Sequence, residues 1–292
     1  MVKYFCGVDG GGTSCRARIV DEQGHFLGEA KTGSANILLG VELAMASIED
    51  AISQAAHQAG ISDLSEISVG LALAGAEQKS AWLDFMSLPQ PYGHFTLNTD
   101  GYGACIGAFS GENGAIVIAG TGSVGIYLEN GNQHVVGGRE FPISDQGGGA
   151  VMGLRLIQQT LLAHDDLRAT SSLSEYVLTH FDHDLDAIVS WSKTAKPRDY
   201  GQFSPKIFEL AMQRDELAME LLQGSADDVE RLILGLNRKG AKQIALMGSI
   251  GERIVSWLSP AAQALLVQPK ADAMAGAILM ASGDHNLYPF PR

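Results

Sequence analysis

The chain has 292 residues, of which 46% are hydrophobic and 18% charged, so two domains with sizeable cores are expected, each of roughly 100–200 residues. A formal net charge of -13 argues against nucleic acid as a partner, because binding to a phosphate backbone depends on clustered lysine and arginine. No apolar run reaches the length of a membrane span and no basic leader precedes the first strand, so the sequence predicts a cytoplasmic protein with no membrane partner.

Strand and helix patterns alternate along the first part of the chain. In chain order they predict a hairpin at 3–8 and 14–20, an amphipathic helix at 39–59, a buried strand at 67–74, a helix near 80–86, a strand at 95–98 and a helix of small residues at 102–109. The three cysteines, Cys6, Cys15 and Cys105, show no paired C-x-x-C spacing, so neither a disulfide framework nor a zinc site is expected.

The pattern starts again at residue 114, after a turn-rich segment at 110–114. A second hairpin is followed by a helix that opens at Gly147, two more helices across 204–238, a strand at 243–247 and a helix from Glu252. We therefore expect an N-terminal domain over 1–110 and a C-terminal domain over 111–292. The last helix, about 272–282, could pack back on the N-terminal domain.

Both predicted hairpins contain a Gly-Thr turn between two apolar strands. The turns are Asp9-Gly10-Gly11-Gly12-Thr13 and Ala119-Gly120-Thr121-Gly122-Ser123. Glycines let backbone N–H groups approach a ligand closely, and these groups together with a threonine hydroxyl bind anionic oxygens. Either turn alone is more often a structural turn. Two of them about a domain apart indicate that a phosphate chain is bound by both.

Two common nucleotide-binding patterns are excluded by the sequence. No G-x-x-x-x-G-K-[ST] segment occurs, which excludes a P-loop NTPase. The glycine turn after Asp9 leads into another strand and not into a helix, so the fingerprint of dinucleotide-binding domains fails as well.

The order of these motifs resembles the acetate and sugar kinase, heat-shock and actin superfamily. In that superfamily two glycine turns grip the phosphates of ATP and a later strand with small residues contacts adenosine, as Leu246-Met247-Gly248-Ser249 would here. The resemblance implies an α/β fold with two actin-like ATPase (ribonuclease H-like) domains and a nucleotide cleft between them. It also implies an ATP site made by Gly11, Gly12, Thr13, Gly120, Thr121, Gly122, Gly248 and Ser249.

Within the superfamily the details look closest to the Bad/Bcr-type ATPase family, and there to the N-acetylglucosamine kinases and bacterial glucosamine kinases. The resemblance covers essentially the whole chain, and the segments 33–36 and 139–147 look most similar to the glucosamine kinases. It implies an ATP- and Mg²⁺-dependent kinase that phosphorylates the 6-hydroxyl of glucosamine, with N-acetylglucosamine as the alternative substrate. Related kinases are often dimers, which makes a homodimer one expectation.

Phosphoryl transfer to a sugar needs a carboxylate that accepts the hydroxyl proton. Asp100, just past the end of the strand at 95–98, is the candidate base, and it would also contact the substrate. The alternative is that Asp100 caps the helix that follows it. By resemblance, Asp9 would hold Mg²⁺, usually through water. Its alternative is an aspartate that stabilises its own turn.

The resemblance also implies a sugar pocket made by Asn36, Gly138, Arg139 and Asp145. An amide and a carboxylate can bind neighbouring hydroxyls, and such polar groups reject a sugar that leaves them unpaired. The alternatives are that Asn36 forms a local turn, that Asp145 caps a helix and that Arg139 is a surface cation.

Several basic residues and two other function classes remain open. Arg16 and Arg18 lie on one face of the second strand and could reach a phosphate, but charged residues are common on the solvent-facing side of a strand. The basic segment at 193–198 is interpreted first as a loop exposed to solvent. A non-catalytic sugar sensor is one rival function. An activator ATPase of an acyl-CoA dehydratase is the other, although the cysteines lie within predicted strands and a helix rather than in an exposed cluster site.

Overall fold

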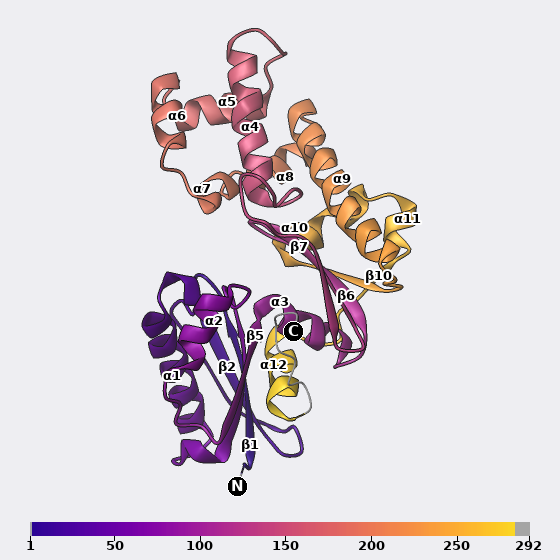
Figure 1. Ribbon diagram of the computed structural model, residues 1–292. Coiled ribbons are helices and arrows are strands. Elements are labelled where there is room, and N and C mark those ends of the chain that lie inside the picture. The colour runs from indigo at the N-terminus through magenta and orange to yellow at the C-terminus, as the bar shows by residue number, and fades with distance from the viewer. Residues whose placement is uncertain (1, 284–292) are drawn as a thin grey trace. The chain divides into compact units, whose positions relative to one another are not determined.

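The computed structural model describes residues 2–283, which form two compact units. The first unit comprises the residues up to Gly114, the segment Leu128–Gln133 and the residues from Gln268 onward. The second comprises Ala115–Tyr127 and His134–Val267. Each is an α/β unit with its own hydrophobic core and its own five-stranded sheet (Figure 1).

The sheet of the first unit is mixed. β1 pairs antiparallel with β2 and parallel with β4, and β4 pairs parallel with β5, which gives the order β3-β2-β1-β4-β5. Parallel neighbours require crossover helices, and these follow β3 and β4. In chain order the elements are β1 (Tyr4–Gly10), β2 (Cys15–Asp21), β3 (Phe26–Thr32), the short 3-10 helix η1 (Ile37–Leu39), α1 (Val41–Gln58), η2 (Leu64–Glu66), β4 (Ile67–Leu73), α2 (Lys79–Met86), β5 (His94–Thr99) and α3 (Asp100–Phe109).

Helices cover both faces of this sheet. On one face, apolar side chains of α1 such as Ile48 and Ile52 join Val8, Ile19 and Leu71 of the strands in a fully buried core. On the other face lie α3 and α12 (Ala273–Ala281), which Figure 1 shows next to each other. The helices approach at backbone distance, since a Cβ added at Gly276 would lie 1.9 Å from the carbonyl oxygen of Gly103.

The second unit has the sheet order β10-β9-β6-β7-β8, with β9 parallel to both β6 and β10. Its strands are β6 (Gly114–Ala119), β7 (Ser123–Glu129), β8 (Asn132–Gly137), β9 (Ile244–Met247) and β10 (Leu266–Val267). The buried strand residues Ala115, Val117 and Ala119 pack into one core with α4 and α9.

Helices make up most of the second unit. They are α4 (Gly149–His164), α5 (Ser172–His180), α6 (Leu185–Ser192), α7 (Pro197–Gly201), α8 (Ser204–Met212), α9 (Glu216–Arg238), α10 (Gly248–Ile254), η3 (Val255–Trp257) and α11 (Pro260–Gln263). Trp191 of α6 packs against Phe181 and Tyr200, with ring centroids 5.3 and 4.7 Å away, which ties the short helices α6 and α7 to the core.

Most predicted elements are confirmed within a few residues, but some boundaries differ. The predicted helix at 39–59 begins only at Val41, because η1 precedes it with Gly40 between them at φ 133°. The helix predicted from Tyr102 begins at Asp100, and the one predicted from Glu252 begins at Gly248. Strands β3, β8 and β10 and helices α5 to α7 were not predicted. Among residues 2–283, no helix is both long and apolar enough to cross a membrane.

Candidate functional site

The first glycine turn joins β1 to β2 and is held by backbone hydrogen bonds. Gly11 N–H donates to the Ser14 carbonyl at 2.9 Å, and the Gly10 and Gly11 carbonyls accept from the N–H groups of Ala74 and Ala35 at 2.8 and 3.0 Å. Gly12 and Thr13 at the tip are exposed, and a Cβ added at Gly12 would meet nothing within 4 Å. The tip therefore offers free backbone and a hydroxyl to a ligand.

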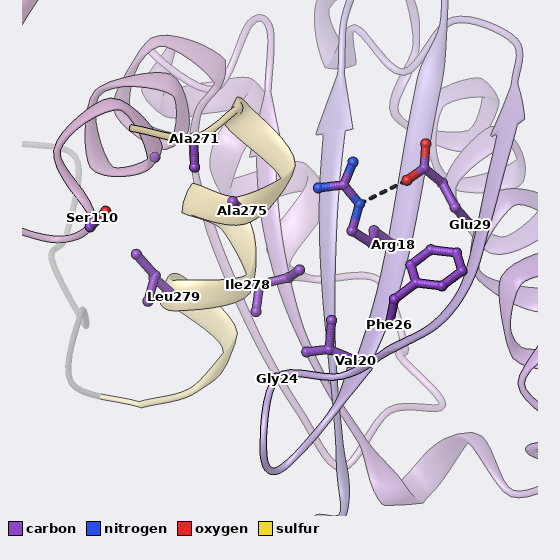
Figure 2. A pocket seen from close by; sticks show the side chains of 11 residues that line it. Arg18, Val20, Gly24, Phe26, Glu29, Ser110, Ala271, Ala275, Ile278 and Leu279 are labelled. Carbon is purple, nitrogen blue, oxygen red and sulfur yellow. Dashed lines mark hydrogen bonds and ion pairs between the residues drawn. The ribbon is translucent and has the colours of Figure 1, made fainter. Parts of the chain in front are cut away.

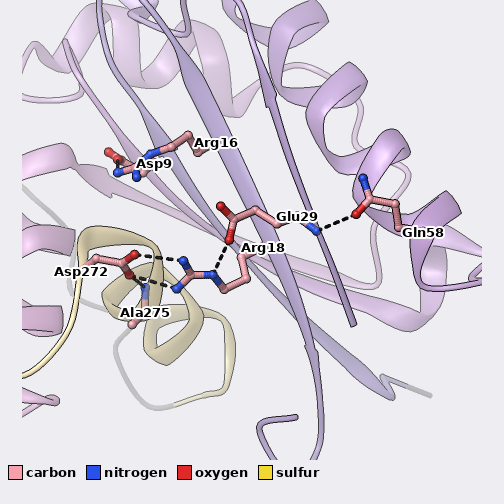
Figure 3. Close-up of polar contacts among 7 residues, drawn as sticks. All are labelled: Asp9, Arg16, Arg18, Glu29, Gln58, Asp272 and Ala275. Atoms are coloured by element: carbon pink, nitrogen blue, oxygen red, sulfur yellow. Dashed lines mark hydrogen bonds and ion pairs between the residues drawn. The ribbon is translucent and has the colours of Figure 1, made fainter. Parts of the chain in front are cut away.

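Asp9, near the end of β1, pairs with a cation across the hairpin. The register places Asp9 opposite Arg16, and Arg16 Nη2 donates to Asp9 Oδ2 at 2.6 Å (Figure 3). Both side chains are partly buried. A partly buried carboxylate beside a glycine turn is a ligand suited to Mg²⁺, and in this structure Arg16 is its cationic partner.

Asp100 is the first residue of α3 and follows β5 directly. The helix is capped by Thr99, whose Oγ1 accepts from Tyr102 N–H at 3.0 Å, so the alternative role of Asp100 as a cap is wrong. Asp100 Oδ1 instead accepts from the N–H of Gly101 at 2.7 Å.

The pKa of Asp100 is raised to about 6. The first cause is desolvation of its carboxylate, and the negative charges of Glu77 and Asp9 add to it. The residue as a whole is nevertheless exposed. A pKa near the working pH is what a general base needs, because most of the groups are then ionised and still basic.

Asn36 lies next to the first turn and caps η1. Its Oδ1 accepts from Leu38 N–H at 2.9 Å, so this oxygen forms the local turn that was the alternative role of Asn36. The neighbouring Ser34 Oγ donates to the Gly11 carbonyl at 3.3 Å, and Ile37 N–H donates to Ala74. The loop that carries Asn36 is therefore joined to the first phosphate turn.

The second glycine turn lies against Asp145. A Cβ added at Gly122 would lie 2.4 Å from Asp145 Oδ2, whereas one added at Gly120 would meet nothing within 4 Å. Desolvation raises the pKa of Asp145, while backbone hydrogen bonds from Ser123 and Glu140 oppose that shift. The N-cap of α4 is Gly148, so Asp145 does not cap this helix with its side chain.

Gly138 and Arg139 follow β8 in the loop that leads to Asp145. Gly138 has φ +65° and its Cα lies close to the Val124 side chain. Arg139 N–H donates to Ser144 Oγ at 3.1 Å, and Ser144 N–H donates to the Glu140 carbonyl at 2.8 Å. The loop is thus closed on itself, with the Arg139 residue exposed.

The predicted adenosine segment lies beside the second turn as well. Gly248 begins α10 with φ +90°, and a Cβ there would lie 2.5 Å from the Ala119 carbonyl oxygen. Ser249 beside it is exposed. Gly120, Gly122, Asp145 and Gly248 are therefore brought together within the second unit.

Arg18 has a structural role that differs from that of Arg16. Its guanidinium donates to Glu29 at 2.7 Å and to both oxygens of Asp272, at 3.2 and 3.0 Å, as Figure 3 shows. Arg18 also lines a cavity of about 620 Å³ formed by β2, Phe26 and α12 (Figure 2). Both of its carboxylate partners belong to the first unit, so Arg18 fastens the start of α12 to the sheet.

The structure adds contacts that were not predicted from the sequence. Arg16 pairs with Asp9, Glu77 acts on the pKa of Asp100, and two serines, Ser123 and Ser225, bind the loop of Asp145. The strand register could have indicated Arg16, because residues seven apart around a tight turn face each other. The contact of Ser225 joins residues 78 apart and has no local signal.

Comparisons with known proteins identify relatives of this chain. Glucosamine kinase GspK from Vibrio cholerae serotype O1 is 61% identical over 290 residues, which cover 98% of this chain and 99% of that protein. N-acetyl-D-glucosamine kinase from Dictyostelium discoideum is 26% identical over 278 residues, 86% of each chain.

Solved structures give the same fold. A candidate N-acetylglucosamine kinase from Chromobacterium violaceum superposes with a TM-score of 0.88 at 31% identity, covering 96% of this chain and 99% of that one. A ROK family glucokinase from Streptomyces griseus, solved with glucose and AMPPNP, shares only the fold, with a TM-score of 0.50 at 16% identity over 95% and 98% of the two chains. This is the two-domain α/β fold of the actin-like ATPases. The family model of the BadF/BadG/BcrA/BcrD ATPases matches residues 6–281, and the chain belongs to that family.

Proposed function

We propose that this protein is an ATP-dependent kinase that phosphorylates the 6-hydroxyl of glucosamine. The observation that carries the proposal is the 61% identity, over nearly the whole chain, to a glucosamine kinase. The candidate residues are compatible with the same reaction, since Asp100 could act as a general base, the two glycine turns could bind phosphates, and Asn36 and Asp145 could bind sugar hydroxyls.

Asp100 would act as the general base. Its carboxylate accepts the proton of the 6-hydroxyl while that oxygen bonds to the γ-phosphorus of ATP and the bond to the β-phosphate oxygen breaks, leaving ADP and glucosamine 6-phosphate. With a pKa raised to about 6, Asp100 is ionised at neutral pH and is a stronger base than an ordinary aspartate.

Backbone N–H groups and hydroxyls of the two turns would bind the ATP phosphates. In the first unit these are Gly11, Gly12 and Thr13, whose tip is open; in the second they are Gly120, Thr121 and Gly122. Gly248 and Ser249, next to the second turn, would contact adenosine. Asp9 would hold Mg²⁺ through water, and the ion would supply positive charge to the phosphates during transfer.

The sugar hydroxyls would be bound by Asn36 and Asp145, with Gly138 and Arg139 beside them. Because Asn36 Oδ1 already accepts from Leu38, its amide nitrogen is the free group that can donate to a hydroxyl. The partly desolvated carboxylate of Asp145 would accept from hydroxyls that point at it.

A coupled assay of ADP release tests the proposal across glucosamine, N-acetylglucosamine, glucose and N-acetylmannosamine. The expected result is the highest kcat/KM with glucosamine. N-acetylglucosamine is the second candidate, because a relative of 31% identity is a candidate kinase of that sugar, and a higher kcat/KM with it would replace the first assignment. No ADP with any sugar would instead favour a sugar sensor or an activator ATPase.

We further propose that the protein works in the cytoplasm as a homodimer. Its three cysteines are buried and form no disulfide among residues 2–283, as a reducing compartment allows. Size-exclusion chromatography with light scattering measures the mass of the protein in solution, and a single species of monomer mass would refute the dimer.

A further inference from the structure

The loop that carries Asp145 is bound from two sides by buried serines. Ser225 of α9 donates from Oγ to the Gly147 carbonyl at 2.9 Å. Ser123 of β7 donates from Oγ to the Gln146 carbonyl at 2.6 Å. Ser225 is 1% exposed and Ser123 is 5% exposed, and Gly147 is buried, so the Gly147 carbonyl could not exchange Ser225 for bulk water without a rearrangement.

Packing holds the same loop at backbone distance from α9. Gly147 has φ +89°, and a Cβ there would lie 2.8 Å from Val229 Cγ2 and 3.1 Å from Val229 N. A side chain at this position would therefore be strained and crowded. The two residues that follow Asp145 are fixed by hydrogen bonds and by shape together.

Helix α9 is itself anchored to α4. Asp228, one turn from Ser225, is 3% exposed and accepts from Arg155 of α4 at 2.8 Å, and it also pairs with Arg231. A buried carboxylate held by two cations is costly to separate from them. The ion pairs of Asp228 thus hold α9 in place, and the loop at Gly147 is hydrogen-bonded to this fixed helix.

We propose that Ser225 is a positioning residue for the sugar, which sets the place of the Asp145 carboxylate through the Gly147 carbonyl. This inference rests on the proposed function and on the role of Asp145 in binding glucosamine. Ser225 would not touch the sugar; it would keep the loop at the distance that the hydroxyls require.

The contacts of the second phosphate turn predict that glucosamine binding is more sensitive to Ser225 than ATP binding. Gly149 and Ala150, at the start of α4, donate to the carbonyls of Gly120 and Thr121 at 2.8 and 2.9 Å. These bonds do not involve Ser225, so the turn keeps its support when the serine hydroxyl is lost. The loop around Gln146 and Gly147 loses one of the two serine hydrogen bonds that join it to β7 and α9.

The test is Ser225→Ala, with kinetics for both substrates and calorimetric titration of glucosamine in the absence of ATP. We expect the glucosamine KM and Kd to rise roughly fivefold, the size that one neutral hydrogen bond supports, with the ATP KM changed less than twofold. Ser123→Ala acts on the same loop from β7 and should shift the same two constants. It serves as the second variant if Ser225→Ala does not fold.

Ser174→Ala is the matched control. Ser174 is also 1% exposed and lies in the second unit, but its hydroxyl bonds only within the capping box of α5, with Ser171. It should lower the melting temperature as Ser225→Ala does and leave the glucosamine KM unchanged.

Two outcomes would overturn the inference. One is an unchanged glucosamine KM and Kd in both Ser225→Ala and Ser123→Ala; the other is equal rises of KM for glucosamine and ATP. Wild-type protein that binds no glucosamine would refute the proposed function instead, and Asp145→Asn, which should raise the glucosamine Kd more than Ser225→Ala does, separates the two failures.

Discussion

The two glycine turns share a sequence design but differ in their surroundings. The first turn is charged: Asp9 pairs with Arg16, and desolvation, to which the charges of Glu77 and Asp9 add, raises the pKa of Asp100. The second turn is packed: Gly122 lies against Asp145, and the start of α4 donates to its carbonyls. We infer that substitutions of the charged residues near the first turn act mainly on the chemical step, whereas substitutions near the second turn that displace Asp145 act on the fit of the sugar.

Asp100→Asn should have the largest effect and tests the chemical half of this contrast. Loss of the base should lower kcat by roughly 10²- to 10⁴-fold with little change in the Kd of ATP. A stopped-flow or steady-state assay of ADP release measures kcat. A kcat within tenfold of the wild type would remove Asp100 from the role of base.

The same variant has an opposite effect on stability. Because burial raises the folded-state pKa of Asp100 above its ordinary value of 3.8, the ionised carboxylate destabilises the fold at pH values above about 6. Asp100→Asn should therefore melt at a higher temperature than the wild type at pH 8. The difference in melting temperature should shrink as the pH falls through 6. It should vanish below about 4, where residue 100 is uncharged in the wild type as well as in the variant.

Gly122→Ala and Gly12→Ala compare equivalent turns directly. A methyl group at Gly122 would displace Asp145, so we expect the glucosamine Kd to rise about tenfold or more, the cost of a displaced binding group. A methyl group at Gly12 meets nothing within 4 Å, so the melting temperature should change by no more than the equivalent of about 0.5 kcal/mol. Equal weakening of glucosamine binding by both variants would break the contrast.

The pH profile is the next test, and its expected effect is smaller. In the wild type, kcat/KM should fall on the acid side with an apparent pKa near 6, because protonated Asp100 cannot accept the hydroxyl proton. Glu77→Gln removes a negative charge that raises this pKa, so the acid limb should move to lower pH. A limb that stays in place would show that Glu77 does not act on the base.

Arg18→Met should have the smallest effect. Arg18 pairs with Glu29 and Asp272, and these side chains are 26%, 37% and 40% exposed, so solvent screening limits the loss to about 1 kcal/mol of unfolding free energy. Denaturant unfolding measures it, with the glucosamine KM as the control that should not move. A lost kcat would instead place Arg18 in the site, beside Arg16.

The sequence predicts the parts of the fold that local chemistry determines. Apolar alternation around a glycine turn identifies both hairpins, and Asp100 is recognisable because it directly follows a buried strand. Strand β10 has only two residues, and the buried residues of β3 are the small Gly28 and Ala30, so neither strand produces a clear apolar pattern. Helices α6 and α7 are short and are stabilised by the packing of Trp191, which is a tertiary contact.

The sequence indicates candidate site residues but not the side-chain contacts that hold them in place. Asn36, Asp100 and Asp145 follow from the sequence by resemblance to a family, and their roles in this protein remain predictions. The pairing of Arg16 with Asp9 depends on register, and the bond from Ser225 to Gly147 depends on how a helix 78 residues away packs. Side-chain contacts over such separations are set by tertiary structure, which a single sequence does not display.

The contact of α12 with the first sheet has a consequence for the order in which the protein is made. Gly7 of β1 and Gly70 of β4 both lie at backbone distance from α12, which the ribosome synthesises only after all of residues 115–267. The first unit therefore begins synthesis first but receives the last helix that covers its sheet only at the end, so β1 and α3 stay uncovered on that face while residues 115–267 are made. Exposed strands and apolar helices in nascent chains favour aggregation, so this face of the first unit is at risk until α12 has been made.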